Sequence, residues 1–417
     1  MKIAVIGAGI VGITTAYELS RDGHEVTVLE QRAAAAEEAS FANAGVVAPG
    51  YVTPWASPGM SWKVLQQLFA THAAVRISLP LSGADLAWIW RFWRACRADI
   101  YTTQRAALQK LAFYSRERLH AITDKHQLEY DRSEGYMVLL RSEKERALVQ
   151  PGLQVLRDAG VAFNELDEAA TRLIEPALNP DTHFDGAVQL PGDEVGNCRQ
   201  FALMLKDIAR AQGVNFEFNS QVHGVDNAQA ATVFIANSDS PEPPVARRFD
   251  AVVLCAGVTS AALLKAAQIP IAMRPVYGYS ISAQVREPLN APRSALMDER
   301  YKVAISRLGQ RVRVAGSAEI GGHSATKNAS ALQTLYKVLH DWFPGAAVMS
   351  QGVQEWKGAR PMLADRPPII GASGLPGIWI NTGHGSSGWA LSCGSARLLA
   401  DHIAGRVPEL DAAVFGL

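Results

Sequence analysis

The hydrophobic pattern is clearest at the start of the chain. Residues 3–6 form an apolar run of strand length, followed by a glycine-rich turn and a stretch with helical periodicity. Gly23 stands where the C-terminal cap of that helix is expected, and residues 25–29 have the pattern of a second strand. The order of strand, tight turn, helix and strand predicts a βαβ unit.

Residues 60–125 have a mostly helical pattern with two groups of large apolar side chains. The first group is Trp62, Leu65, Leu68 and Phe69, and the second is Leu86, Ile89, Trp90 and Trp93, interleaved with Arg91, Arg94 and Arg97. A basic, tryptophan-rich helix is one form of membrane-surface anchor. We expect the other arrangement, in which the tryptophans belong to the core and the arginines face solvent.

Strand and helix patterns alternate through the middle of the chain. They fall at 130–141 (strand), 143–159 and 164–175 (helices), 187–196 (strand and turn), 199–212 (helix) and 215–218, a strand that continues to Val222. Residues 249–254 are a continuous apolar run ending at Cys255-Ala-Gly257, which is typical of a buried parallel strand. We therefore expect the chain to return to its first domain near residue 195.

A different pattern follows between residues 274 and 319. Short strand signals at 276–283, 301–306 and 311–314 are separated by loops that contain glycine and proline. This pattern predicts an antiparallel sheet in a second domain, followed by a helix at about 332–343.

The last 60 residues repeat the order of strand, glycine-rich turn and helix. Strand patterns at 369–371 and 378–381 precede a glycine-rich turn at 382–389 and a helix that runs to Gly405. The N-terminus of a helix favours negative charge, so this turn suits the reduced ring of a flavin, whereas a nicotinamide cofactor would not need it. The alternative is a plain glycine turn in a sheet.

Composition and charge narrow the class of protein. The 417 residues are 48% hydrophobic and 19% charged, enough to form a large core in two domains, and 40 basic residues balance 40 acidic ones, so nothing indicates nucleic acid as a partner. The four cysteines (Cys96, Cys198, Cys255 and Cys393) form no CxxC or metal-ligand pair, which favours free thiols and no metal site. No leader or membrane span is evident. We expect a cytoplasmic protein, and peripheral attachment to the inner face of the cytoplasmic membrane stays open.

The first glycine-rich turn has the G-x-G-x-x-G spacing at Gly7, Gly9 and Gly12. Gly7 can adopt a backbone conformation closed to bulkier residues, Gly9 lets a diphosphate approach the main chain, and Gly12 lets the helix pack on the strand. Glu30 follows Gly12 by eighteen residues, and a carboxylate there can accept the ribose hydroxyls of an adenine dinucleotide. The composite predicts a dinucleotide site rather than an ordinary βαβ unit. Ser40 and Asn43, in a segment of small residues that follows, offer hydrogen bonds to a cofactor unless that segment is a surface loop.

Motifs along nearly the whole chain resemble the bacterial FAD-dependent D-amino-acid dehydrogenases and their wider relatives glycine oxidase, D-amino-acid oxidase and sarcosine oxidase. They are Gly7-Ala-Gly-Ile-Val-Gly12, Ala42-Asn-Ala-Gly45 with Pro49-Gly-Tyr51, Leu190-Pro-Gly-Asp-Glu-Val-Gly196, Tyr301-Lys-Val-Ala-Ile-Ser306, Gly358-Ala-Arg-Pro361 and Asn381-Thr-Gly-His-Gly385. The resemblance implies an α/β protein with a Rossmann-like FAD-binding domain of the GR2 type and a second α+β substrate domain with a mostly antiparallel sheet. We place the FAD-binding domain at 1–85, 195–265 and 346–417, and the substrate domain at 86–194 and 266–345.

The same resemblance implies a set of cofactor contacts. They are Gly7, Gly9, Ile10, Val11, Gly12, Glu30, Gln31, Arg32, Ser40, Asn43, Ala44, Val222, Ala256, Gly257, Gly358, Gly383, His384, Gly385, Ser386, Ser387 and Gly388. We expect His384 to have a backbone or packing role rather than a catalytic one. No cysteine lies near Pro361, where sarcosine oxidases attach their flavin, so we expect noncovalent FAD.

For the substrate, the resemblance implies that Arg360 binds the carboxylate, since a guanidinium forms a planar bidentate pair with it. Tyr279, Tyr301 and Tyr51 could hydrogen-bond the substrate, although a sheet tyrosine is more often part of the core. The implied reaction is hydride transfer from Cα to flavin N5, giving a 2-oxo acid and ammonia, with electrons passed to a quinone or another respiratory-chain acceptor.

The chain departs from the family pattern at Ala359 and Tyr277, where leucine and lysine are frequent, so the preferred substrate could be D-proline or D-hydroxyproline. Two other readings stay open: an oxidase or dehydrogenase of glycine, sarcosine or another small amine, and a flavin-binding subunit of a heteromeric amine dehydrogenase. The sequence does not indicate the oligomeric state.

Overall fold

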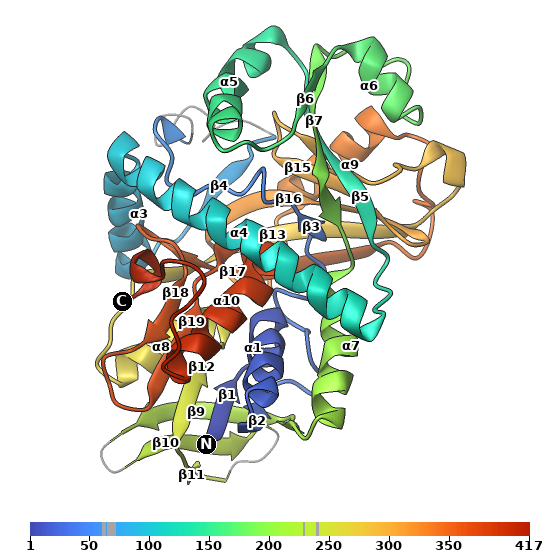
Figure 1. Cartoon of the computed structure of the whole chain (residues 1–417). Helices are drawn as coiled ribbons and strands as arrows, with labels where there is room; N and C mark the ends of the chain where they lie inside the picture. The colour runs from blue at the N-terminus through green and yellow to red at the C-terminus, as the bar shows by residue number, and fades with distance from the viewer. Residues whose placement is uncertain (61–63, 65–71, 228–229, 239–241) are drawn as a thin grey trace.

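The computed structural model describes residues 1–60, 64, 72–227, 230–238 and 242–417. Two large sheets organise this part of the chain (Figure 1). The first has six strands in the order β18 (Ile369–Ala372), β19 (Ile378–Thr382), β12 (Ala251–Leu254), β1 (Lys2–Ile6), β2 (Glu25–Leu29) and β8 (Asn215–Glu217). All its pairs are parallel except the pair of β18 with β19.

Residues 3–6 of β1 and all of β12 are apolar because both faces of the sheet are covered there. Val5 and Val253 pack with α1 (Ile10–Arg21), α7 (Cys198–Ala211) and α10 (Gly388–Ile403). The alternate residues Ala4, Val252 and Leu254 pack instead with the small sheet of β9 (Ser220–Asp226), β10 (Ala231–Asn237) and β11 (Val245–Phe249), and with α8 (Ser260–Ala266). This arrangement is the Rossmann-like domain expected from the sequence.

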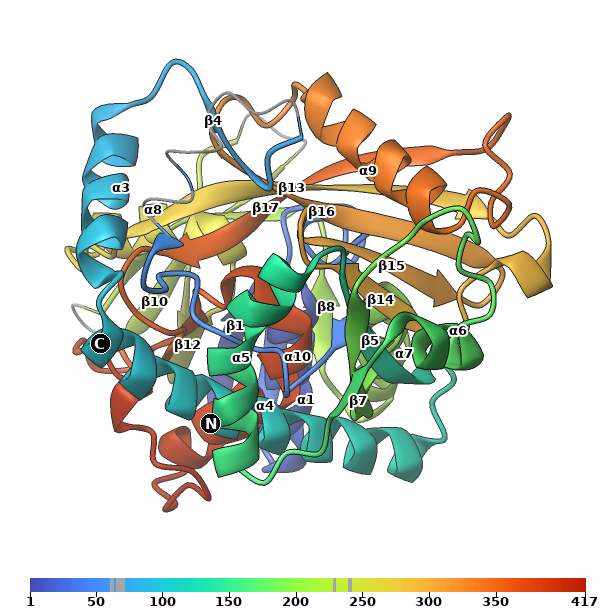
Figure 2. The same cartoon turned by 90° about the horizontal axis from the view of Figure 1, so that it is seen from above.

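The second sheet has ten strands and is mostly antiparallel, as expected. Its main order is β17 (Gln354–Leu363), β13 (Met273–Gln284), β16 (Arg311–Gly321), β15 (Val303–Leu308), β14 (Ala295–Asp298), β5 (Ser133–Leu140), β7 (Gly186–Val195) and β3 (Val46–Val47), with β4 (Val75–Ser78) beside β16 and β6 (Asn164–Leu166) beside β7. Helix α9 (Ala329–Trp342) packs on one face of it, as Figure 2 shows from above. Helices α5 (Glu143–Asp158) and α6 (Glu168–Ile174) lie beyond β5 and β7 (Figure 1).

The predicted residue limits of the two domains stay a prediction. Three strands from the segments that we assigned to the FAD-binding domain, however, belong to the ten-stranded sheet. β17 pairs with β13 throughout its length, and β3 and β4 also belong to the ten-stranded sheet. Helix α4 (Ala98–His126) packs on α1 and α10 and contributes Leu111 and Leu119 to their core. The sequence analysis predicted no strand at β3, β4 or β17, and its helical pattern for 60–125 did not indicate which sheet α4 would cover.

Helix α3 (Gly83–Ala95) corrects one expectation. Trp88 and Phe92 are buried and stacked on each other, whereas Trp90 and Trp93 are 60% and 48% exposed, so the prediction that these two tryptophans belong to the core is wrong. The buried face follows a helical spacing through Trp88, Phe92 and Ala95 that excludes the positions between them. The earlier group at Trp62, Leu65, Leu68 and Phe69 lies outside the described residues.

Two other predicted elements differ locally. The predicted helix at 164–175 begins as strand β6, and α6 starts only after Asp167, whose side chain caps it by accepting a hydrogen bond from the Ala170 amide at 2.7 Å. The predicted strand at 301–306 begins at Val303, because Asp298 accepts hydrogen bonds from the amides of Arg300 and Tyr301 and holds them in a turn.

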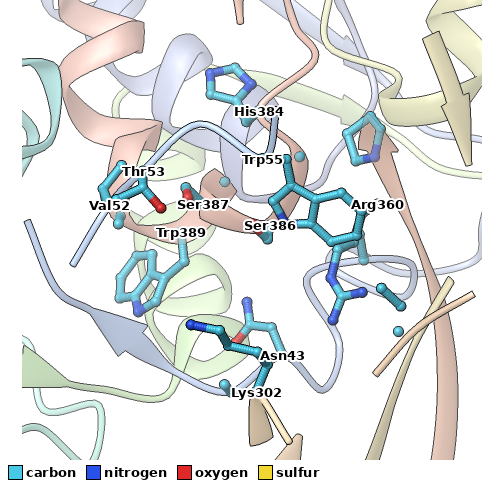
Figure 3. A pocket seen from close by; sticks show the side chains of 18 of the residues that line it. Asn43, Val52, Thr53, Trp55, Lys302, Arg360, His384, Ser386, Ser387 and Trp389 are labelled. Carbon is cyan, nitrogen blue, oxygen red and sulfur yellow. The ribbon is translucent and has the colours of Figure 1, made fainter. Parts of the chain in front are cut away.

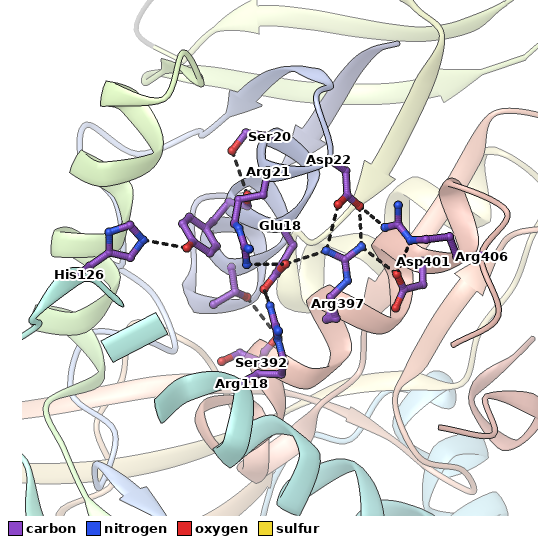
Figure 4. Close-up of polar contacts among 12 residues, drawn as sticks. Glu18, Ser20, Arg21, Asp22, Arg118, His126, Ser392, Arg397, Asp401 and Arg406 are labelled. Carbon is purple, nitrogen blue, oxygen red and sulfur yellow. Dashed lines mark hydrogen bonds and ion pairs between the residues drawn. The ribbon is translucent and has the colours of Figure 1, made fainter. Parts of the chain in front are cut away.

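The helices that follow the two glycine turns, α1 and α10, run in the same direction. The Thr14 hydroxyl lies 3.2 Å from the Ser392 carbonyl, and one turn further on the Glu18 carboxylate lies 2.8 Å from Arg397. Glu18 has no exposed surface, and Arg118 of α4 also donates to it at 2.6 Å, so this buried charge is well paired (Figure 4). The shared direction brings both helix N-termini to the same edge of the six-stranded sheet.

Candidate functional site

A cavity of about 1960 Å³ lies where both helix N-termini meet the ten-stranded sheet. Its walls come from both sheets and from the loops between them, and Figure 3 shows part of it. The structure brings most of the predicted cofactor residues to this cavity. They are Gly7, Gly9, Ile10, Val11, Glu30, Gln31, Arg32, Ser40, Asn43, Ala44, Val222, Ala256, Gly257, Gly358, His384, Gly385, Ser386, Ser387 and Gly388.

Gly12 and Gly383 are not among these lining residues, because both lie in tight packing behind the cavity. A Cβ atom on Gly12 would lie 1.8 Å from the Gly7 carbonyl oxygen, and one on Gly383 would lie 2.3 Å from Leu363. Gly7 has a φ of +102°, and its own Cβ would lie 2.8 Å from the Cys255 carbonyl oxygen. Gly7 therefore supplies the turn conformation, while Gly12 lets α1 approach β1.

Glu30 and Ser40 shape the cavity around the first turn. The Glu30 carboxylate is 9% exposed and accepts hydrogen bonds from the amides of Ala8 at 2.7 Å and Arg32 at 2.8 Å, while burial raises its pKa. The Ser40 hydroxyl accepts from the Ile10 amide at 3.0 Å, at the N-terminus of α1. Both groups are fixed by the backbone and keep hydrogen-bonding capacity for a ligand.

The second turn leads from β19 through η3 (Gly385–Ser387) into α10. His384 is buried, its Nε2 lies 3.0 Å from the Ser395 hydroxyl, and burial lowers the pKa of its imidazole to about 3. The ring is therefore neutral at ordinary pH and does not supply a proton. Ser386 and Ser387 stand beside the open space of the cavity in Figure 3.

The loop at 43–45 is held from three sides. Arg313 Nη1 donates to the Asn43 carbonyl at 3.2 Å, the Ser306 hydroxyl donates to the Ala44 carbonyl at 2.7 Å, and the Trp389 indole donates to the Gly45 carbonyl at 3.1 Å. These contacts come from β16, β15 and α10, so the loop joins the two sheets at the cavity.

Arg360 on β17 projects into the cavity (Figure 3). Its Nη1 donates to the Ser317 carbonyl at 2.9 Å, and burial alone lowers its pKa to about 10, since within the described residues no acidic side chain lies close enough to pair with it. A guanidinium with that pKa remains charged at pH 7. A buried charge without a protein partner is costly, and an anion in the cavity would offset that cost.

The three predicted tyrosines lie in different places. Tyr51 lines the cavity, but its hydroxyl donates to Glu299 at 2.7 Å and accepts from Lys302 at 3.0 Å. Tyr279 also lines the cavity, but its ring packs with residues of α9 and its hydroxyl donates to Glu319. The structure does not bring Tyr301 to the cavity, because the turn after Asp298 directs its ring toward Arg141, whose Cζ lies 5.2 Å from the ring centroid.

Several cavity residues were not predicted. They include Trp55, Glu299, Lys302 and Trp356, whereas Tyr277, expected near the pocket, does line the cavity. Trp356 and Tyr277 stand close in sequence to Arg360 and Tyr279, and strand alternation would have placed Trp356 on the same face as Arg360. Nothing in the sequence distinguishes Trp55 from the other tryptophans of this part of the chain.

A parallel sheet with two glycine turns, covered at its carboxyl edge by a second sheet that carries a buried arginine, defines a two-domain dinucleotide-dependent enzyme. Residues 2–402 match the model of the family described as "FAD dependent oxidoreductase" (DAO), and the chain belongs to this family. It is 39% identical to a D-amino acid dehydrogenase of Cereibacter sphaeroides over 100% of this chain and 95% of that protein. It is 37% identical to D-amino acid dehydrogenase 1 of Mesorhizobium japonicum over 99% and 98%.

Among solved structures, the glycine oxidase of Geobacillus kaustophilus has the same fold, with a TM-score of 0.75, 19% identity and coverage of 100% of this chain and 97% of that one. The predicted fold class, family and dependence on FAD are confirmed.

The residues present fit FAD. Gly9 has space at the cavity, since a Cβ on it would lie 3.5 Å from the Ser40 hydroxyl, and the amides around Gly9 and Val11 stand at a helix N-terminus that suits a diphosphate. Glu30 would hold the ribose. The start of α10 at Gly388 would face the flavin ring.

Proposed function

We propose that this protein carries out the FAD-dependent oxidative deamination of D-amino acids to 2-oxo acids and ammonia, with electrons passed to a quinone or another respiratory-chain acceptor. The single observation that carries the proposal is Arg360, a buried guanidinium without an acidic partner among the described residues, which borders the same cavity as both glycine turns. The D-amino acid dehydrogenases that share 37–39% of its residues support the choice of substrate.

In this proposal, each part of the cavity has one task. FAD, bound noncovalently, supplies the hydride acceptor. Arg360 binds the substrate carboxylate as a bidentate pair and thereby fixes the position of Cα. Trp55 and Trp356 provide apolar walls, while Tyr51 closes the cavity through its contact with Glu299. Neutral His384 supports the turn at α10 rather than transferring a proton.

The test is anaerobic reduction of the purified flavoprotein. We expect D-amino acids, D-proline or D-hydroxyproline among them, to bleach the flavin absorbance, and the L-enantiomers to leave it unchanged. In air, turnover with a quinone analogue should exceed the release of hydrogen peroxide. Peroxide formed at the full turnover rate would contradict the assigned acceptor, and no bleaching across the panel would contradict the activity.

We further propose that the protein binds the surface of a membrane through α3. Among the described residues, no helix combines the length and apolar character needed to cross a bilayer. The exposed face of α3 nevertheless carries Leu86, Trp90 and Trp93, with Arg91 and Arg94 beside them, and the exposed Leu79 lies four residues before the helix. Aromatic and basic side chains together suit the interface of an anionic membrane, and Trp93 also lines the cavity.

Replacing Trp90 and Trp93 together by serine should therefore weaken binding to vesicles that contain phosphatidylglycerol by about ten-fold or more. Leu289→Ser is the matched control, because Leu289 is 83% exposed and lies in the short helix η2 (Pro288–Asn290), between β13 and β14. Co-sedimentation with the vesicles measures the effect. Equal binding by both variants would contradict the role of α3.

A further inference from the structure

The sheet beside Arg360 contains an irregularity. In the pairing of β13 with β16, Tyr277 lies opposite Glu319 and Tyr279 lies opposite Gly316, so Gly278 alone faces both Ser317 and Ala318. Two residues opposite one form a β-bulge. Ser317, in the bulge, has a φ of +56°, a left-handed conformation that is uncommon for a residue other than glycine.

The bulge and Gly278 both contact Arg360. The Ser317 carbonyl accepts the hydrogen bond from Arg360 Nη1 at 2.9 Å. A Cβ on Gly278 would lie 2.3 Å from Arg360 Nη2 and 2.4 Å from its Cζ, so the guanidinium rests directly on the glycine backbone. The φ of Gly278 is not positive, so the backbone does not require glycine here. Glycine is needed because the Arg360 guanidinium occupies the place of a Cβ atom.

A second glycine extends this surface. Gly358 of β17 is the register partner of Gly278, and Trp356 covers it so closely that a Cβ there would lie 1.8 Å from the indole. The two facing glycines form a flat shelf. Arg360 and Trp356 lie on it, and both line the cavity.

We propose that Gly278 and Ser317 are positioning residues that set the plane and reach of the Arg360 guanidinium for the substrate carboxylate. This inference rests on the carboxylate-binding role proposed above for Arg360. An arginine side chain is long and flexible, and this one has no acidic partner among the described residues to fix it. The Ser317 carbonyl and the bare backbone at Gly278 supply the restraint instead, and a planar bidentate contact requires that restraint.

The first test is Gly278→Ala. The added carbon collides with the end of a side chain and not with backbone, so we expect the fold and flavin content to persist while the guanidinium moves. In a site that depends on exact positioning, a displacement of about 1 Å lowers the reaction rate on the order of 100-fold. We expect KM for the D-amino acid and Kd for benzoate, read from the absorption spectrum of the bound flavin, to rise by about that factor, with a smaller change in kcat.

Gly224→Ala in β9 is the matched control, because a Cβ there would lie 3.7 Å from Phe234 in ordinary contact. It should bind benzoate as the unmodified protein does. Ser317 itself has a positive φ of +56°. Ser317→Val disfavours that φ and should weaken benzoate binding, which tests the bulge even if Gly278→Ala fails to fold.

A double-mutant cycle with Arg360→Lys separates this inference from the proposed function. If Gly278 acts through the guanidinium, adding Gly278→Ala to Arg360→Lys should change the Kd for benzoate less than about threefold. If the effects of the two substitutions on this Kd are fully additive, the inference is overturned. Unchanged benzoate binding in Gly278→Ala, with weakened binding in Arg360→Lys, would overturn the inference alone. Unchanged binding in Arg360→Lys would overturn the role of Arg360 and the inference with it.

Discussion

Arg360→Ala should reduce kcat/KM for the preferred D-amino acid by about a thousand-fold, because it removes the charged partner of a desolvated carboxylate. Most of the loss should appear as a higher KM. Flavin should remain bound, since the hydrogen bond from Arg360 goes to Ser317 and to neither glycine turn. The melting temperature should hold or rise, because the variant removes a buried charge that has no acidic partner among the described residues.

The measurement combines anaerobic dye-coupled kinetics, the flavin spectrum and thermal unfolding. Arg286→Ala is the matched control, since Arg286 is exposed just beyond the end of β13 in the same sheet. Arg360→Lys keeps the charge without the planar fork and should give an intermediate KM. A KM unchanged in Arg360→Ala, or loss of flavin without an effect on KM, would contradict the assigned role.

Elements close together in the sequence were the most predictable. The unit from Lys2 to Glu30 carries its strand, glycines, helix and acid within thirty residues, and the structure gives each glycine the environment expected from its position. Gly12 packs on Gly7, and Gly9 borders the cavity. The second turn at 382–389 was predictable for the same local reason.

Side-chain direction in the second sheet was less predictable, because it depends on pairing between distant segments. Tyr279 faces Glu319, forty residues later, rather than Arg360. Tyr301 stands in a turn set by Asp298, and the next residue, Lys302, has a φ of +51° and lines the cavity in its place. Alternation along a strand cannot reveal such a shift of face.

Burial on α3 was mistaken for a related reason. Trp88, Trp90 and Trp93 have similar local sequence, but within the described residues only the Trp88 indole has a hydrogen-bond partner, the Met362 carbonyl at 2.9 Å. Arg360 itself was assigned from the resemblance of its motif. Its restraint by Ser317, forty-three residues earlier on another strand, depends on a bulge that no local pattern indicates.

Gly12→Ala should yield a protein that is largely free of flavin and has a lower melting temperature even as the apoprotein. The added carbon would lie 1.8 Å from the Gly7 carbonyl oxygen, which is backbone and cannot rotate away. Helix α1 must then move off β1, at an overpacking cost of about 1–3 kcal/mol or more, and its N-terminus leaves the diphosphate position. FAD titration of the apoprotein and thermal unfolding measure the two effects separately.

Gly9→Ala distinguishes cofactor binding from packing within the same turn. Its Cβ would lie 3.5 Å from the Ser40 hydroxyl, in ordinary contact, so the apoprotein should melt as the unmodified protein does. Flavin affinity should still fall, because the methyl group enters the space where the diphosphate meets the backbone. Gly83→Ala, whose Cβ meets no atom of the described residues within 4 Å, should leave flavin affinity unchanged. An apoprotein of Gly12→Ala with unaltered stability would mean that α1 does not depend on this close contact, and equal flavin affinity in Gly9→Ala would remove the first turn from the cofactor site.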